Sequence, residues 1–263
     1  MRALRRPVLA ATVLAAALLA TGCAGPAAGG STPTASTPAL SGELTVSAAA
    51  SLRGAFDEIA AQFSEEHPDV DVRPFSYDGS STLATQIVEG DQVDVFASAD
   101  QKNMQKVVDA GLASNPTLFA TNTLVIVVPK GDPAGIRTLA DLAKPGVTVV
   151  LCAPEVPCGS AAQTLLAGAG VTVTPASQEQ NVTAVLTKVA AGEADAGLVY
   201  TTDAKSSADV EAIVPDGADE VVNQYPIVAL DDAPDPEVAA AFVAFVLGPR
   251  GQAVLADLGF GTL

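Results

Sequence analysis

Residues 43–74 read ELTVSAAASLRGAFDEIAAQFSEEHPDVDVRP, a short β-branched run, an amphipathic stretch and a second β-branched run. From Leu52 to Phe63 the apolar residues recur at spacings of four, three, one and three, which predicts a helix with one buried face. The flanking runs at 44–46 and 70–74 predict strands. A strand, a helix and a second strand in this order indicate α/β architecture.

The same alternation continues to residue 258. We predict further strands at 93–96, 123–128, 147–151, 197–200 and 226–230. We predict further helices at 80–90, 101–110, 160–167, 181–191, 236–247 and 251–258. The sequence shows no repeat with a period of 20 to 50 residues, which argues against a solenoid. The sequence therefore predicts α/β domains with a largely parallel sheet.

Composition excludes several classes of function. The chain has 263 residues, of which 49% are hydrophobic, enough for the core of one or two domains. Its 13 Lys and Arg against 30 Asp and Glu give a net charge of -17, so we expect no nucleic-acid partner. His67 is the single histidine, and no motif links it to a serine, so neither a multi-histidine zinc site nor a Ser-His-Asp hydrolase is expected.

The N-terminal residues predict export. Three arginines precede an apolar run at 8–20 that is too short to span a membrane, as in a secretory signal, here residues 1–22. The end of this segment, LATGC at 19–23, resembles the lipobox of bacterial lipoproteins, which implies lipidation of Cys23 after cleavage. Plain secretion with a free Cys23 thiol is the alternative. Residues 23–42 then form a predicted lipid-anchored flexible linker, because the stretch after the cysteine has no charged or aromatic residue.

The other two cysteines, Cys152 and Cys158, lie six residues apart. In an exported chain a disulfide between them is favoured, and closing so small a loop would contribute about 2 kcal/mol. Two independent thiols are the alternative, since spacing does not show whether the Cα atoms lie close enough.

Most predicted helices follow a strand and begin near Ser, Gly or Asn. In open α/β sheets ligands collect at the carboxyl ends of the strands, where helix N-termini present unpaired N–H groups. Ordinary helix capping accounts for any one of these residues taken alone.

Five segments, in order, resemble segments of the molybdate-binding proteins of bacterial ABC importers. They are SAAASL (47–52), GSSTLA (79–84), DVFASAD (94–100), PEVPCG (154–159) and GLVY (197–200). The similarity extends over 43–263 and implies a two-lobed, type II periplasmic binding protein, in which two crossover strands join two α/β domains. It implies a first lobe of 43–122 and 227–263, a second lobe of 123–226, and a ligand cleft between them.

The resemblance also implies the ligand-binding residues. In that family two serine hydroxyls, backbone N–H groups and one tyrosine hydroxyl hold the oxyanion, without a cationic side chain. Carried over, these are Ser51 and Ser80 in the first lobe, and the amides of Cys158 and Val182 with the Tyr200 hydroxyl in the second. Other members commonly have Ala at the position of Cys158, so a bridge to Cys152 would lie beside the anion.

The function implied is that of an extracytoplasmic lipoprotein on the outer face of the membrane, a monomer that captures molybdate, and tungstate as well, for an ABC permease. No cofactor and no catalysis are implied. The alternatives are another tetrahedral oxyanion such as sulfate or phosphate and, in a different class, a lipid-anchored hydrolase. Molybdate only accepts hydrogen bonds, whereas protonated phosphate needs an acceptor, for which Asp78 is the nearest acid. Residues 122–125 and 224–227 are the hinge candidates.

Overall fold

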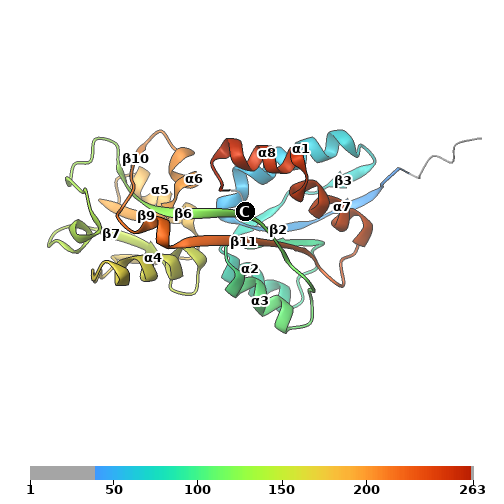
Figure 1. Ribbon diagram of the computed structural model, residues 1–263, viewed down its shortest axis with the longest axis horizontal. Helices are drawn as coiled ribbons and strands as arrows, with labels where there is room; N and C mark the ends of the chain where they lie inside the picture. Colours follow the sequence, from blue (N-terminus) through green and yellow to red (C-terminus); the bar gives the residue numbers. More distant parts are fainter. Residues whose placement is uncertain (1–38, 262–263) are drawn as a thin grey trace, which may run out of the picture. The chain divides into compact units, whose positions relative to one another are not determined.

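The computed structural model describes residues 39–261 (Figure 1). The predicted signal peptide, the predicted lipidation site Cys23 and the predicted linker up to residue 38 lie outside the described residues. Within 39–261 no single helix is long and apolar enough to cross a membrane; the helices Pro236–Leu247 and Pro249–Leu258 pass that test only as a pair, bent by 55°.

Two groups of helices and strands share two long strands, β6 (Thr117–Pro129) and β11 (Val222–Ala229). The first lobe contains β1 (Gly42–Leu44), β2 (Val46–Ala49), β3 (Val70–Val72), β4 (Ser76–Asp78), β5 (Val95–Ala97), α1 (Arg53–Glu66), α2 (Ser80–Val88), α3 (Gln101–Asp109), α7 (Pro236–Leu247) and α8 (Pro249–Leu258). The second lobe contains β7 (Val149–Cys152), β8 (Ser177–Glu179), β9 (Ala196–Tyr200), β10 (Val210–Ile213), α4 (Pro157–Gly168), α5 (Val182–Ala190) and α6 (Thr201–Lys205). Short 3-10 helices occur at Ala50–Leu52, Leu139–Ala143 and Ala218–Glu220.

One sheet runs through both lobes in the order β4-β2-β5-β11-β6-β9-β7-β8, with β10 on β6. Pairing is parallel within each lobe, from β4 to β5 and from β9 to β8, and antiparallel wherever β6 or β11 takes part. Figure 1 shows β6 and β11 side by side between the two groups. The predicted fold, two α/β lobes joined by two crossover strands, is confirmed. The pairing of β11 with β6 shifts register at Tyr225/Pro226, within the hinge candidate 224–227. The lobe boundaries and the hinges themselves stay predictions.

Each lobe has its own apolar core. In the first lobe, the predicted helical stripe of α1 is buried, and Phe56 and Phe63 pack edge-on against Phe242 of α7 at ring distances of 6.0 and 5.3 Å. In the second lobe, α4 and α5 pack against β7 and β9 around residues such as Val185 and Leu198. Ala50, which follows β2, joins the core of the second lobe. The lobes therefore touch directly where the first-lobe strand β2 ends.

Some elements differ from those predicted. The strand predicted at 44–46 is two strands, because β1 pairs with β3 while β2 pairs with β4 and β5. The helix predicted from Ser160 begins three residues earlier, at Pro157, a residue suited to the first turn because it needs no N–H partner. This earlier start puts Cys158 in the first turn of α4.

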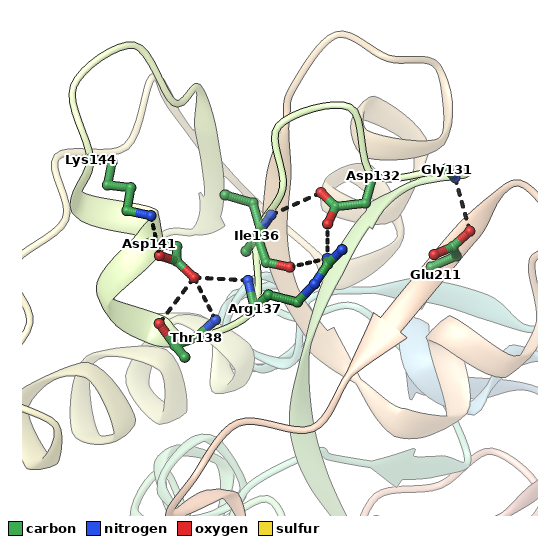
Figure 2. A network of polar contacts seen from close by, with 8 residues as sticks. All are labelled: Gly131, Asp132, Ile136, Arg137, Thr138, Asp141, Lys144 and Glu211. Atoms are coloured by element: carbon green, nitrogen blue, oxygen red, sulfur yellow. Dashed lines mark hydrogen bonds and ion pairs between the residues drawn. The ribbon is translucent and has the colours of Figure 1, made fainter.

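The loop after β6 is fixed by its own polar contacts (Figure 2). The Asp141 carboxylate accepts hydrogen bonds from the backbone N–H groups of Arg137 and Thr138, both at 2.8 Å. The Lys144 ammonium, 2.6 Å away, and these two N–H groups hold the pKa of Asp141 well below its usual range. Arg137 also pairs with the buried carboxylate of Asp132. None of these residues borders the two cavities described below.

Candidate functional site

A small cavity lies between the lobes, with about 190 Å³ of empty space including the part open to solvent. Its first-lobe wall is Ala49, Ala50, Ser51, Asp78, Gly79 and Ala99. Its second-lobe wall is Val156, Pro157, Cys158, Val182 and Tyr200. The wall thus combines the end of β2 and the starts of α2, α4 and α5, as expected for a ligand site at strand ends.

Four of the five predicted binding residues line this cavity: Ser51, Cys158, Val182 and Tyr200. The fifth, Ser80, is fully buried but is not part of the wall. Its hydroxyl oxygen accepts a hydrogen bond of 2.9 Å from the backbone N–H of Ala99, which is in the wall. Because a hydroxyl can accept and donate at once, this bond leaves the Ser80 proton available for another acceptor.

The Cys158 and Val182 amides belong to first helical turns. Val182 is the first residue of α5, and Cys158 the second of α4. N–H groups in a first turn have no partner within their helix, and the helix dipole adds partial positive charge there. Two such ends facing one cavity favour an anion.

The Tyr200 hydroxyl is buried without a partner. The side chain is 1% exposed, and its hydroxyl oxygen makes no hydrogen bond within residues 39–261. Its ring packs edge-on against that of Tyr225, with ring centres 6.0 Å apart. Burial, followed by the nearby Tyr225 and Asp100, raises the pKa of Tyr200 well above its usual value, so the group keeps its proton and can donate it. A buried unpartnered hydroxyl costs stability, which a ligand that accepts its hydrogen bond would restore.

Ser51 is held by a residue that sequence reasoning missed. Its hydroxyl lies 3.0 Å from the hydroxyl of Tyr225, a fully buried residue of the crossover strand β11. Tyr225 falls inside the hinge candidate 224–227, directly before the predicted strand 226–230, and the sequence did not identify it as a site residue. The pair connects the cavity wall to the strand on which the lobes are joined.

The wall contains no Lys or Arg and one acid, Asp78. Its Oδ1 accepts hydrogen bonds from the backbone N–H of Gly79 at 2.7 Å and from Nδ2 of Asn181 at 2.8 Å. A hydrogen-bond acceptor therefore borders the cavity, to which a protonated anion could donate. Gly79 and Asn181 are further residues that the sequence did not single out.

A second, larger cavity adjoins the first, and Ser51 borders both. Its wall carries two cationic side chains, Arg53 and Lys205, and three acids, Asp57, Asp203 and Asp257. Because its wall carries charges of both signs, this cavity favours neither an anionic nor a cationic ligand. His67 borders neither cavity and packs against Phe63 at a ring distance of 4.6 Å, so the single histidine does not share a cavity wall with Ser51. The smaller cavity is the candidate site.

Cys152 and Cys158 form a disulfide, with Cα atoms 5.8 Å apart. It ties the end of β7 to the first turn of α4, and therefore holds the Cys158 amide at the cavity. We predict that replacing both cysteines with alanine lowers the free energy of unfolding by about 2 kcal/mol, measured by urea denaturation. Reduction with dithiothreitol should have the same effect on the wild type and none on the double variant; a reductant effect on both would contradict this.

Asp203 lies beside the larger cavity, and its raised pKa predicts that stability depends on pH. Burial raises its pKa to about 7, although its carboxylate accepts the Tyr200 backbone N–H at 3.1 Å. Because the folded state then holds this proton more tightly than the unfolded state, stability falls as pH rises from about 4 to about 7. Asp203→Asn, which keeps the acceptor, should remove that part of the slope in denaturation measured across this range. Parallel curves for wild type and variant would contradict the assignment.

Comparison with known proteins accords with this arrangement. Residues 44–261 match the family model described as bacterial extracellular solute-binding protein. The chain is 48% identical over 220 residues to the molybdate-binding protein ModA of Mycobacterium tuberculosis H37Rv, covering 82% of this chain and 84% of the relative. It is 35% identical to the ModA of Escherichia coli K12, covering 83% and 89%. The solved periplasmic molybdate-binding protein of Azotobacter vinelandii superposes with a TM-score of 0.73 at 22% identity, covering 84% of this chain and 99% of that one. The chain belongs to the bacterial extracellular solute-binding proteins, in the branch that includes these relatives.

Proposed function

We propose that this protein is an extracytoplasmic solute-binding lipoprotein that captures molybdate, and tungstate as well, and delivers it to an ABC permease. The observation that carries the proposal is the unpartnered, buried Tyr200 hydroxyl, in a wall without Lys or Arg that two helix N-termini face. Such a wall offers mostly donors, and a fully deprotonated tetrahedral dianion offers only acceptors. The names of the relatives that share the fold support molybdate as that anion.

The proposed contacts follow from the wall. Ser51 donates from the first lobe, and Ser80 does so after a small rotation from its position behind the wall. The Cys158 and Val182 amides and the Tyr200 hydroxyl donate from the second lobe. Because the anion bridges donors from both lobes, it favours the closed arrangement, reached by rotation about β6 and β11. Holding and releasing the anion forms and breaks no covalent bond, so the proposal requires neither catalysis nor a cofactor.

Thermal unfolding of the chain from residue 24 onward, with molybdate, tungstate, sulfate or phosphate, tests the proposal. A ligand at a thousand times its dissociation constant adds about 4 kcal/mol of stability. We expect molybdate and tungstate to raise the midpoint at micromolar concentrations. Stabilisation by sulfate or phosphate alone would instead favour the alternative oxyanions. Of these two, only protonated phosphate has a proton to donate, and the Asp78 acceptor in the wall is the observation that supports it.

The membrane anchor is a separate part of the proposal. Lipidation of Cys23 would hold the solute-binding domain at the outer face of the cell membrane. Expression of the full chain and of Cys23→Ser in a bacterium tests it. We expect the wild type in the membrane fraction and the variant in the soluble extracytoplasmic fraction; equal distribution of the two would contradict the anchor.

A further inference from the structure

The two lobes come into close contact at Gly79, the residue before α2. A Cβ atom built on Gly79 would lie 2.1 Å from the backbone carbonyl oxygen of Gln180 in the second lobe, and 3.2 Å from Cγ1 of Val156. The backbone angles of Gly79, φ -61° and ψ 135°, suit any residue. Glycine is therefore needed here for the approach of the opposite lobe, and the conformation of its own chain does not require it.

A hydrogen bond joins the lobes beside this contact. Nδ2 of Asn181 donates to Oδ1 of Asp78 over 2.8 Å, between residues 103 positions apart. The other end of the Asn181 side chain caps α5 by accepting the N–H of Ala184 at 2.9 Å. The same Asp78 oxygen accepts the N–H of Gly79 at 2.7 Å. Each side chain is thus fixed within its own lobe before it reaches across, which lowers the entropy lost on closure.

These contacts are at the wall of the candidate site. Asp78 and Gly79 line the cavity, and Asn181 directly precedes Val182, whose amide is a proposed donor. Opening the lobes at this edge therefore requires the Asp78–Asn181 bond to break. A bond to a carboxylate is stronger than one between neutral groups, so it contributes to how long the closed form persists.

We propose that Asp78, Gly79 and Asn181 form a closure latch, in which Gly79 permits the lobes to meet and the Asp78–Asn181 bond slows release of the anion. All three act as positioning residues for the site. The proposal deepens the function proposed above and rests on it. A side chain at 79 keeps the second-lobe donors away from the anion, whereas the first lobe folds normally.

Gly79→Ala tests the contact, with Gly168→Ala as the matched control. Gly168 ends α4, has no positive φ, and a Cβ there would meet nothing within 4 Å. With sodium molybdate and isothermal titration calorimetry, we expect the dissociation constant of Gly79→Ala to rise about 100-fold, since the second-lobe hydrogen bonds to a charged ligand are lost. Small-angle scattering should show compaction on adding molybdate for the wild type and the control, and none for Gly79→Ala.

The outcomes separate the latch from the function. A wild type that neither binds molybdate nor compacts contradicts the proposed function, and the latch falls with it. A wild type that binds, together with a Gly79→Ala variant that binds and compacts equally well, overturns the latch alone. Equal melting temperatures of the two ligand-free variants would confirm that Gly79→Ala is folded; if it is not, the test below decides.

A double-mutant cycle tests the bond itself through the molybdate dissociation rate, measured by stopped-flow tyrosine fluorescence, since the chain has no tryptophan. Asn181→Ser keeps a capping oxygen but loses the Nδ2 group that reaches Asp78, because the serine side chain is shorter, and Asp78→Ala loses the acceptor. We expect the change at 181 to speed release about tenfold in the wild-type background and to have little effect in Asp78→Ala. The cycle cancels any direct repulsion between Asp78 and the anion. Asp78→Asn, which keeps an acceptor oxygen, should restore most of the coupling; independent effects of the two changes would overturn the latch.

Discussion

Gly159→Ala is expected to lower the free energy of unfolding by about 3 kcal/mol, or the melting temperature by roughly 10 °C. A Cβ on Gly159 would lie 1.9 Å from the carbonyl oxygen of Ala153 and 2.7 Å from that of Cys152. Both atoms are backbone, so no rotamer change relieves the clash. The disulfide between Cys152 and Cys158 further limits movement of this loop. Urea denaturation with the disulfide intact measures the loss.

The same substitution should weaken anion binding, because Gly159 directly follows Cys158 in the first turn of α4. Gly168→Ala, in the last turn of the same helix, is again the control and should change stability by less than about 0.5 kcal/mol. Equal stabilities of the two variants would show that the loop yields more readily than its backbone contacts indicate.

Tyr200→Phe is expected to change stability and affinity in opposite directions. Removing an unpartnered buried hydroxyl should raise the stability of the ligand-free protein by about 1 kcal/mol, because the ring packing against Tyr225 is kept. The affinity for molybdate should fall by between about 10-fold and 100-fold, the value of a hydrogen bond to a charged acceptor. Denaturation without ligand and calorimetric titration with molybdate measure the two effects.

Tyr77→Phe is the matched control for this prediction. The Tyr77 hydroxyl donates to Asp57 at 2.7 Å and does not border the candidate site. Its loss should leave molybdate affinity unchanged and lower stability slightly. If Tyr200→Phe binds molybdate as tightly as Tyr77→Phe does, the Tyr200 hydroxyl is not a ligand contact.

Helices whose apolar residues recur at a clear helical spacing could be predicted from the sequence. Helix α7 occupies the predicted residues 236–247, and α1 buries the predicted stripe around Phe56 and Phe63. The elements that were missed include β4 and β10, which are short and partly exposed and form only because β2 and β6 offer them an edge. Such strands depend on tertiary pairing, which local sequence does not show.

The candidate site was predictable only in part. The family resemblance named five residues, of which four line the small cavity, but their grouping depends on which helix starts converge. Two details are beyond local sequence: the Ser80 oxygen is already bonded to the Ala99 N–H, and Asp78 meets Asn181 across 103 residues. Contacts of this kind follow from how the two lobes meet, and neither periodicity nor capping rules describe that.

The shared strands and the late helices α7 and α8 also set an order in which the chain can fold. The second-lobe elements β7 to β10 and α4 to α6 come from one continuous stretch, whereas the core around Phe56 and Phe63 requires Phe242, which lies 186 and 179 residues further along, respectively. Closing so long a loop is entropically costly and slow. The second lobe can therefore form its core from nearby residues while the first still lacks the helix that covers its aromatic side chains. Until α7 docks, those phenylalanines remain a surface on which unfinished chains can aggregate.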